Sequence, residues 1–322
     1  PLGKGSALIS GSYRIPVACV RARAVFTNTI PTQAYRSSGR PEVTYVIEQL
    51  IEKAADQVGI DAQKLKEINL ISQQEMPYTN PIGLTYDSGD YHKSVNLAKK
   101  MAAWDDREKR REISKQKGKL RGIGFANYVE SSIGSPVEQA EVYIKPEGIV
   151  ELVIGTQPSG QGHETSFAQV AADWFGLSLN EVKIIIGDTD IVKIGGGSHS
   201  GRSMRMAGTV IVRACDEVIE KGQKLASDLL EASIADIEFS NGEFFIKGTD
   251  SKISLFEIAN NLKKSKNGKF RSSDLDVIKS NEMHTPVVPN GCHICEVELD
   301  PETGEVKIVN YVAVDDVGRA IN

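Results

Sequence analysis

The chain has 322 residues, of which 40% are hydrophobic and 25% charged, and it carries a formal net charge of −5. This mildly acidic balance argues against a general affinity for nucleic acid or for an anionic membrane surface. No apolar run approaches the ~20 residues that a membrane-spanning helix needs, and four cysteines in a chain of this length do not form a disulfide framework. We therefore expect a cytoplasmic protein with no membrane span and no nucleic-acid partner.

The N-terminal part of the chain is predicted to contain one strand and three helices. Alternating apolar residues indicate a strand at 20–26, and a turn-rich segment follows it. Apolar residues at helical spacing predict a helix over 43–54, which Gly59 ends, and Asp61 can cap a short second helix. Residues 92–117 are typical of a helix with a polar face rich in both charge signs.

Strands and helices intermix in the rest of the chain. The expected strands are 122–128, 140–144, 149–154, 182–186, 237–239, 243–246, 293–299 and 306–314, and the expected helices are 166–175, 210–229 and 255–262. This pattern predicts an α+β (mixed α/β) fold, with two lobes of mixed sheets and packed helices. The length supports two hydrophobic cores. We expect the boundary near Lys117, which divides the chain into domains 1–117 and 118–322.

The most informative stretch runs from Gly155 to Thr165, between a predicted strand and a predicted helix. Bare backbone N–H groups beside a helix N-terminus suit an anionic ligand, because the unpaired amides and the helix dipole both favour negative charge. Gly160 and Gly162 let the backbone approach a ligand closely, and Gln161 can donate and accept hydrogen bonds. The alternative is an ordinary strand–helix connector. A second turn of the same kind makes the ligand hypothesis the stronger one.

That second glycine- and serine-rich turn precedes the predicted helix 210–229. Its candidate ligand-binding residues are Gly197, Ser198, His199, Ser200, Gly201, Arg202 and Ser203. Hydroxyls and amides at a helix start, flanked by arginine, are typical of a phosphate cradle. Serines that only cap the helix and solvated arginines would explain this turn equally well. Two such turns together favour one extended, phosphate-bearing cofactor, although neither matches a dinucleotide fingerprint or a P-loop.

The third candidate is the loop from Pro31 to Glu42, in which Arg36, Ser37 and Ser38 precede a predicted helix. Loops often present functional groups. From this segment alone, a polar surface turn is the better interpretation.

Cys292 and Cys295 have the CxxC spacing that occurs in metal and redox sites, but no second CxxC or pair of histidines accompanies them. Neighbouring residues on the predicted strand point to opposite faces, so a shared metal site is disfavoured. We interpret both cysteines as packing residues. His163 could be a general base, but in a cofactor turn a supporting hydrogen bond is the better role.

Taken together, these segments resemble the molybdenum-binding large subunit of the xanthine dehydrogenase/aldehyde oxidase/carbon monoxide dehydrogenase family. The resemblance covers nearly the whole chain, in family order. The matching stretches are Tyr13-Arg14-Ile15-Pro16, Thr27-Asn28-Thr29, Gln33-Ala34-Tyr35-Arg36, Gly39-Arg40-Pro41-Glu42, Gly160 to Thr165, Gly187-Asp188-Thr189-Asp190, Gly197 to Ser203, Pro289 to His293 and Val314 to Arg319.

The resemblance implies a molybdopterin cytosine dinucleotide cofactor and oxidative hydroxylation with water as the oxygen source. Gln161 matches the family glutamine that hydrogen-bonds near the molybdenum ligands, while the metal itself is held through the pterin. The turn from Ser198 to Ser203 matches the segment around the metal side and the pyrophosphate. Arg36, Ser37 and Ser38 match the active-site loop that faces metal and substrate.

Two departures from the family narrow the expected substrate. The copper-containing carbon monoxide dehydrogenases carry a cysteine where this chain has Ser37, and a hydroxyl oxygen is a poor ligand for Cu(I). Xanthine-type enzymes carry an aromatic residue at the position of Ser38 that stacks on a purine. An aldehyde or another N-heterocycle remains as the expected small-molecule substrate.

The resemblance also implies partners: an iron–sulfur small subunit with 2Fe-2S clusters and a medium subunit with FAD, in a dimer of heterotrimers. The family's catalytic glutamate would lie beyond Asn322, so this portion alone is expected to be inactive. The alternative is a non-catalytic cofactor-binding or assembly module from a truncated or split gene. A reading frame that continues past Asn322 into a Gly-x-Gly-Glu segment would decide between them.

Overall fold

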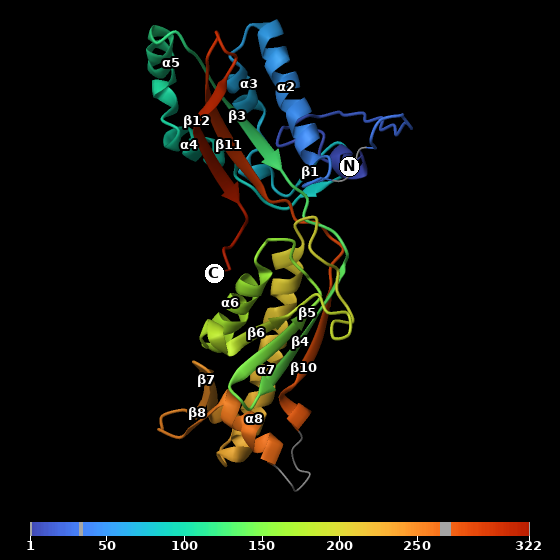
Figure 1. Ribbon diagram of the computed structural model, residues 1–322, viewed down its shortest axis with the longest axis vertical. Coiled ribbons are helices and arrows are strands. Elements are labelled where there is room, and N and C mark those ends of the chain that lie inside the picture. The colour runs from blue at the N-terminus through green and yellow to red at the C-terminus, as the bar shows by residue number, and fades with distance from the viewer. Residues whose placement is uncertain (1, 32–34, 265–271, 322) are drawn as a thin grey trace. The chain divides into compact units, whose positions relative to one another are not determined.

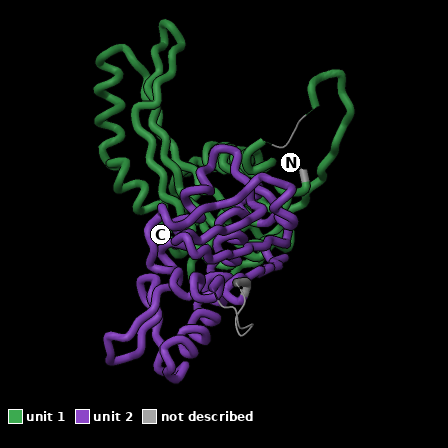
Figure 2. The backbone as a smooth tube through the Cα atoms, turned by 60° about the horizontal axis from the view of Figure 1, so that its bottom comes forward, with its two compact units in different colours: residues 1–132, 286–320 green, residues 133–285, 321–322 purple. Residues whose placement is uncertain are grey.

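The computed structural model describes residues 2–31, 35–264 and 272–321 (Figure 1). Residues Thr32, Gln33 and Ala34 of the third candidate segment lie outside these ranges. The chain forms two compact units, unit 1 with residues 1–132 and 286–320, and unit 2 with residues 133–285 and 321–322 (Figure 2). This grouping follows spatial contacts. The predicted boundary near Lys117 separates two cofactor-binding domains, which are not the same as these two units, and it stays a prediction.

Unit 1 is built around a three-stranded antiparallel sheet with the order β12 (Val306–Asp316), β11 (Asn290–Leu299) and β3 (Leu120–Val129). Alternate residues on the strands, such as Phe125 and Ile294, are buried and form the core with helix α4 (Tyr91–Met101). The other elements are α1 (Leu2–Ser6), α2 (Arg40–Val58), α3 (Ala62–Asn69), α5 (Arg107–Gln116), the hairpin β1 (Tyr78–Thr79) and β2 (Thr85–Tyr86), and short 3₁₀ turns at Gln73–Glu75 and Trp104–Asp106.

The first helices of unit 1 follow the predicted signals. Helix α2 ends at Gly59, whose φ of 68° lies in the left-handed region that glycine adopts freely. The side chain of Asp61 caps α3 by accepting a hydrogen bond from the N–H of Lys64 at 2.9 Å. The prediction of one helix over 92–117 is wrong. Ala103, at φ 46°, separates α4 from α5 so that Trp104 can pack edge-to-face on Phe125.

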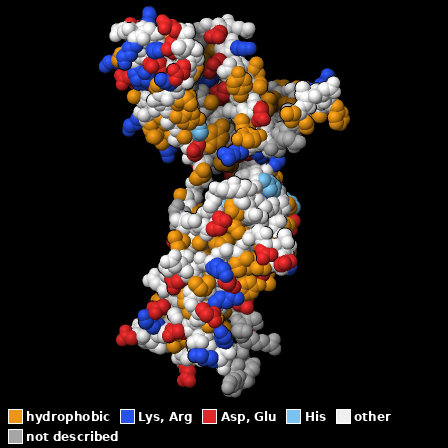
Figure 3. All heavy atoms as spheres, in the orientation of Figure 1, with side chains coloured by type: hydrophobic (Ala, Val, Ile, Leu, Met, Phe, Trp, Pro, Cys, Tyr) orange, Lys and Arg blue, Asp and Glu red, His pale blue; other side chains and the backbone are white. Residues whose placement is uncertain are grey.

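The predicted strand at 20–26 is also wrong, since the described residues 16–31 contain no helix or strand. Alternation alone does not make a strand, because each strand needs a neighbour for its backbone hydrogen bonds. No described strand pairs with this segment. Its apolar side chains are therefore exposed, including Val25, Phe26 and Ile30. Figure 3 shows hydrophobic side chains on the surface of the segment that extends from unit 1.

Unit 2 contains a mixed sheet with the order β10 (Val277–Glu282), β4 (Val137–Lys145), β5 (Ile149–Ile154) and β6 (Val182–Ile185). Strands β5 and β6 are parallel, and helix α6 (His163–Phe175) connects them. Helix α7 (Thr209–Leu229) follows a π-helical turn, η4 (Met204–Gly208), and packs on β4 and β10. The sequence analysis missed β10, which pairs with β4.

The remaining elements of unit 2 form a second, smaller sheet and its helix. They are β7 (Ile237–Ser240), β8 (Glu243–Ile246), β9 (Lys252–Ser254) and α8 (Leu255–Lys264), with 3₁₀ turns at Leu179–Glu181, Ile234–Asp236 and Ser272–Leu275. The expected α+β fold with mixed sheets is confirmed. Within the described ranges, no helix combines the length and apolar character that crossing a membrane requires.

Candidate functional site

The two glycine-rich turns of unit 2 lie in direct contact. A Cβ atom built on Gly155 would come within 2.2 Å of the Cα of Gly195 and 2.6 Å of the carbonyl oxygen of Ile194. The first turn leaves the carboxyl end of β5, the kind of position where open α/β sheets bind ligands. Two segments about forty residues apart in sequence therefore form one continuous backbone surface.

The first turn presents unpaired backbone amides at the start of α6. Gly160 and Gly162 adopt φ values of 100° and 73°, and a Cβ on either residue would meet open space. Gly162 caps α6 without a side-chain hydrogen bond. Among the described residues, no hydrogen-bond partner is recorded for the N–H groups of residues 160–164. These donors, together with the helix dipole, are available to an anion.

Gln161 and His163 occupy different environments in this turn. The side chain of Gln161 is exposed, and its Oε1 accepts a hydrogen bond from the N–H of Ser159. His163 is buried, and its ring stacks on Phe167. Its Nδ1 lies 3.2 Å from both the carbonyl oxygen of Thr156 and Oγ of Ser198. A carbonyl oxygen can only accept a hydrogen bond. The contact between Nδ1 and the carbonyl of Thr156 is therefore a hydrogen bond only when Nδ1 carries the proton. His163 thus links the two turns, and its buried ring is not exposed as a free base.

The second turn is held by its own side chains before η4 begins. Oγ of Ser198 lies 2.9 Å from Oγ of Ser203, and Nε2 of His199 lies 3.1 Å from the carbonyl oxygen of Gly196. Ser200 adopts a φ of 53°, and Gly201 a φ of 67°. Gly197 has a φ of 70°, and a Cβ there would meet open space. The second turn therefore leaves open space at Gly197, as the first turn does at Gly160 and Gly162.

Arg202 lies beneath the turns, with 1% of its surface exposed. Its Nη1 forms an ion pair with Oε2 of Glu138 at 2.8 Å and donates to the carbonyl oxygen of Gly197 at 2.7 Å. The recorded partners of Arg202 all belong to the protein interior. The sequence suggested a guanidinium flanking a phosphate, whereas the side chain is used here for internal pairing.

Glu138 and Thr156 are the residues of this region that the sequence analysis missed. Both are fully buried, and Oγ1 of Thr156 donates a hydrogen bond to Glu138. A signal for Glu138 was present. It lies on β4 in phase with the buried residues Ala140 and Val142, which places a carboxylate on an apolar face. A buried carboxylate needs a partner, and that requirement points to a buried cation nearby.

The loop with Arg36, Ser37 and Ser38 belongs to unit 1. Ser37 and Ser38 have φ values of 60° and 46°, so two successive non-glycine residues adopt the left-handed conformation. Such conformations persist only where the surroundings hold them, and they are frequent at functional sites. The buried Arg40 supplies this support. It pairs with Glu130 at 2.6 Å and donates to the carbonyl oxygen of Ser37 at 3.1 Å.

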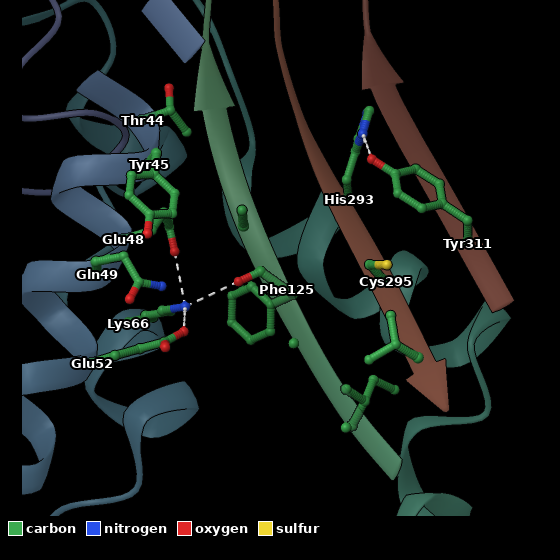
Figure 4. Close-up of a pocket in the computed structure, with 15 residues that line it drawn as sticks. Thr44, Tyr45, Glu48, Gln49, Glu52, Lys66, Phe125, His293, Cys295 and Tyr311 are labelled. Atoms are coloured by element: carbon green, nitrogen blue, oxygen red, sulfur yellow. Dashed lines mark hydrogen bonds and ion pairs between the residues drawn. The ribbon is translucent and has the colours of Figure 1, made fainter. Parts of the chain in front are cut away.

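A separate pocket of about 430 Å³ lies in unit 1 between α2 and the outer face of the sheet (Figure 4). The buried ammonium group of Lys66 lies beside it and contacts Glu48 at 2.9 Å, Glu52 at 2.8 Å and the carbonyl oxygen of Phe125 at 3.0 Å. The single ammonium group is thus paired with two carboxylates. The pocket floor is formed by small and apolar residues such as Gly124 and Cys295.

The two cysteines of the CxxC sequence differ in burial. Cys292 is buried, and burial raises the pKa of its thiol to about 12, whereas Cys295 is half-buried and lines the pocket. Over the described residues, no group of three or more His, Cys, Asp or Glu side chains is arranged to hold a metal ion.

The turns fit a phosphate-bearing group. Residues 160–164 supply amide donors without recorded partners, and the open positions at Gly160, Gly162 and Gly197 leave room for close approach. Glu164 in the first turn of α6 is exposed, and its negative charge opposes an anion placed beside it. Five backbone N–H groups, those of residues 160–164, stand against this single solvated carboxylate.

Comparison with known proteins is consistent with a cofactor site at these two turns. Models of the molybdopterin cofactor-binding domain match residues 97–322 and 2–70. The chain is 31% identical over 98% of its length to the 6-hydroxypseudooxynicotine dehydrogenase complex subunit gamma of Paenarthrobacter nicotinovorans, and it covers 40% of that protein. It is also 31% identical over 98% of its length to the carbon monoxide dehydrogenase large chain of Hydrogenophaga pseudoflava, of which it covers 41%.

The fold is also similar to that of a solved structure. The crystal structure of quinoline 2-oxidoreductase from Pseudomonas putida 86 matches all of this chain with a TM-score of 0.88 and 29% identity, and the chain covers 43% of that protein. The chain thus spans about two-fifths of the relatives that it matches. Because one family model alone covers most of its residues, the chain belongs to the molybdopterin cofactor-binding domain family.

Proposed function

We propose that this chain is the portion of a molybdenum hydroxylase large subunit that binds a molybdopterin dinucleotide through the turns 155–165 and 195–203. The observation that carries the proposal is the contact between these turns at Gly155 and Gly195, which brings the free amides of the α6 N-terminus beside the second turn. When bound, the cofactor would supply the two-electron redox chemistry of oxidative hydroxylation, with water as the oxygen source.

The residues of the chain have separate parts in this proposal. The N–H groups of residues 160–164 bind the anionic groups of the cofactor, and the amide nitrogen of Gln161 donates a hydrogen bond beside the metal ligands. Ser198, Ser200 and Ser203 supply hydroxyls along the second turn. Arg36, Ser37 and Ser38 orient the substrate, and no residue of this chain is proposed as the general base.

The cytosine dinucleotide form, an iron–sulfur subunit, an FAD subunit and a dimer of heterotrimers complete the proposal. One relative is a subunit of a dehydrogenase complex, and this likeness supports partner subunits. We propose an aldehyde or an N-heterocycle as substrate, since Ser37 offers Cu(I) a hydroxyl in place of a thiolate. The cytoplasmic location expected from the composition belongs to this proposal too.

Molybdenum and pterin analysis of the full-length complex tests the cofactor site. We compare wild type, Gln161→Ala and the control Gln116→Ala, which removes an exposed glutamine at the end of α5 in unit 1. The expected result is less molybdenum per protein in Gln161→Ala only. Unchanged cofactor content in that variant would refute the assignment of Gln161.

A further inference from the structure

One buried carboxylate oxygen lies between the two turns of unit 2. Oε2 of Glu138 accepts hydrogen bonds from Oγ1 of Thr156 in the first turn and from the N–H of Gly196 in the second turn, the latter at 3.3 Å. It also pairs with Nη1 of Arg202 at 2.8 Å. A single atom on β4 therefore receives donors from both turns.

The guanidinium of Arg202 makes the reciprocal connections. Nη1 also lies 3.2 Å from Oγ1 of Thr156, and it donates to the carbonyl oxygen of Gly197 at 2.7 Å. Nε and Nη2 donate to the carbonyl oxygens of Ser135 and Val137 at 3.1 and 3.0 Å, which ties both turns to the start of β4. The planar fork of arginine allows this set of bonds, which a lysine ammonium could not reproduce.

The backbone around the guanidinium is shaped to admit it. A Cβ on Gly196 would lie 2.5 Å from Cζ of Arg202, and a Cβ on Gly134 would lie 3.0 Å from its Cδ. Glycine at position 196 is thus a steric requirement of the buried arginine, whereas a Cβ on Gly134 would first meet the ring of His199, at 2.7 Å. Oε1 of Glu138 is buried without a recorded hydrogen bond, so the pair is incompletely satisfied and is a poor source of stability.

We propose that Glu138 and Arg202 are positioning residues that clamp the turns 155–165 and 195–203 together, so that both turns face one ligand. The identity of that ligand rests on the proposed function, whereas the clamp does not. Buried ion pairs often contribute little stability. We infer that the Glu138–Arg202 pair serves instead to fix the positions of the two turns. Neither residue touches the ligand in this role.

The test uses the full-length complex with three variants and a control. Arg202→Lys keeps the charge and removes the fork. Glu138→Leu combined with Arg202→Met removes both charges, so that no unpaired charge stays buried and the fold is retained. Thr156→Val removes only the hydroxyl in the first turn. The control, Lys279→Met, breaks an ion pair with Glu217 elsewhere in unit 2.

Two readouts separate a clamp from a structural role. The first is amide hydrogen exchange of residues 156–165, measured in protein without cofactor. The second is molybdenum and pterin content. We expect the amides of residues 156–165 to exchange faster when Arg202, which lies on the other turn, is substituted. We expect the cofactor content to fall roughly 10–100-fold, as it does when other residues that support metal sites are substituted. Thermal unfolding and circular dichroism check that the double variant keeps its fold.

The outcomes distinguish the two proposals. If the double variant folds, retains cofactor and shows wild-type exchange in 156–165, the clamp is refuted although the proposed function stands. If wild type holds no molybdopterin but exchange still rises across the turns, the proposed function is refuted and the clamp stands. Equal effects from Lys279→Met would also overturn the clamp, because they would show a general loss of stability.

Discussion

Gly155 and Gly195 are in backbone contact: a Cβ atom on either residue would lie 2.2 Å from the Cα of the other. Only glycine permits this approach, because real Cβ contacts never become so short. The contact joins the end of β5 to the segment before η4. It makes two separate sequence motifs one surface, and the proposed cofactor site depends on it.

Gly195→Ala is therefore expected to separate the turns. Overpacking usually costs about 1–3 kcal/mol, and we expect at least about 3 kcal/mol here because backbone, and not a flexible side chain, blocks the new methyl group. Denaturant unfolding measures this loss. The control is Gly124→Ala on β3, where a Cβ would meet nothing within 4 Å and the change should stay within about 0.5 kcal/mol. Equal stability of the two variants would contradict the contact.

Glu48 and Glu52 both form an ion pair with Lys66, yet their removal should have different effects (Figure 4). Glu48 is buried and also accepts from the Tyr13 hydroxyl at 2.6 Å, whereas the Glu52 side chain is 40% exposed. We expect Glu48→Gln to destabilise by about 3 kcal/mol and Glu52→Gln by less than about 1 kcal/mol. Chemical denaturation of both variants checks this order, which a reversed ranking would disprove.

Arg40 should control the conformation of the loop at Ser37 and Ser38. Arg40→Met removes the donor to the Ser37 carbonyl and leaves Glu130 without its cation. We expect the free energy of unfolding to fall by about 3 kcal/mol. This value is at the low end for buried ion pairs because the Glu130 side chain is 19% exposed. Ser38→Gly should instead be neutral or slightly stabilising, since glycine tolerates the φ of 46°. Stability curves for both variants provide the measurement.

Cysteine reactivity should follow burial. Burial raises the pKa of Cys292 to about 12, so at pH 8 it carries roughly a thousandfold less thiolate than a thiol of ordinary pKa. Cys19 is exposed. We expect iodoacetamide at pH 8 to label Cys19 in native protein and Cys292 only after unfolding, as read by mass spectrometry. Cys19→Ser serves as the control that removes the fast label. Rapid native labelling of Cys292 would contradict the burial.

The turn between β11 and β12 should be sensitive to acid. The Lys119 side chain, followed by the N–H of Glu302, holds the pKa of Asp300 at about 2, below its ordinary value near 3.9. A depressed pKa contributes stability that is present above about pH 4 and is lost as pH falls toward 2. Lys119→Met should raise the pKa of Asp300, which an NMR titration of the carboxyl carbon detects. The control Lys247→Met should leave it unchanged.

Local signals explain why much of unit 2 was predictable. Strands β4 and β5 and helix α7 follow periodic burial patterns that their own residues carry, and Asp61 caps α3 through a bond only three residues away. The predictions were wrong where the local structure depends on a residue or strand that is distant in sequence. The alternation at 20–26 lacks a neighbouring strand, and the break at Ala103 follows from the packing of Trp104 on Phe125.

The mixed α+β class, the two glycine-rich turns and the family could all be recognised from the amino-acid sequence. The contact of Gly155 with Gly195 and the inward direction of Arg202 toward Glu138 depend on how the folded chain packs. The physical reason is that periodicity and turn chemistry act over a few residues, whereas the partner of a buried charge is set by packing between strands and turns. Glu138 lies 64 residues from Arg202 in sequence, and no local pattern encodes their 2.8 Å contact.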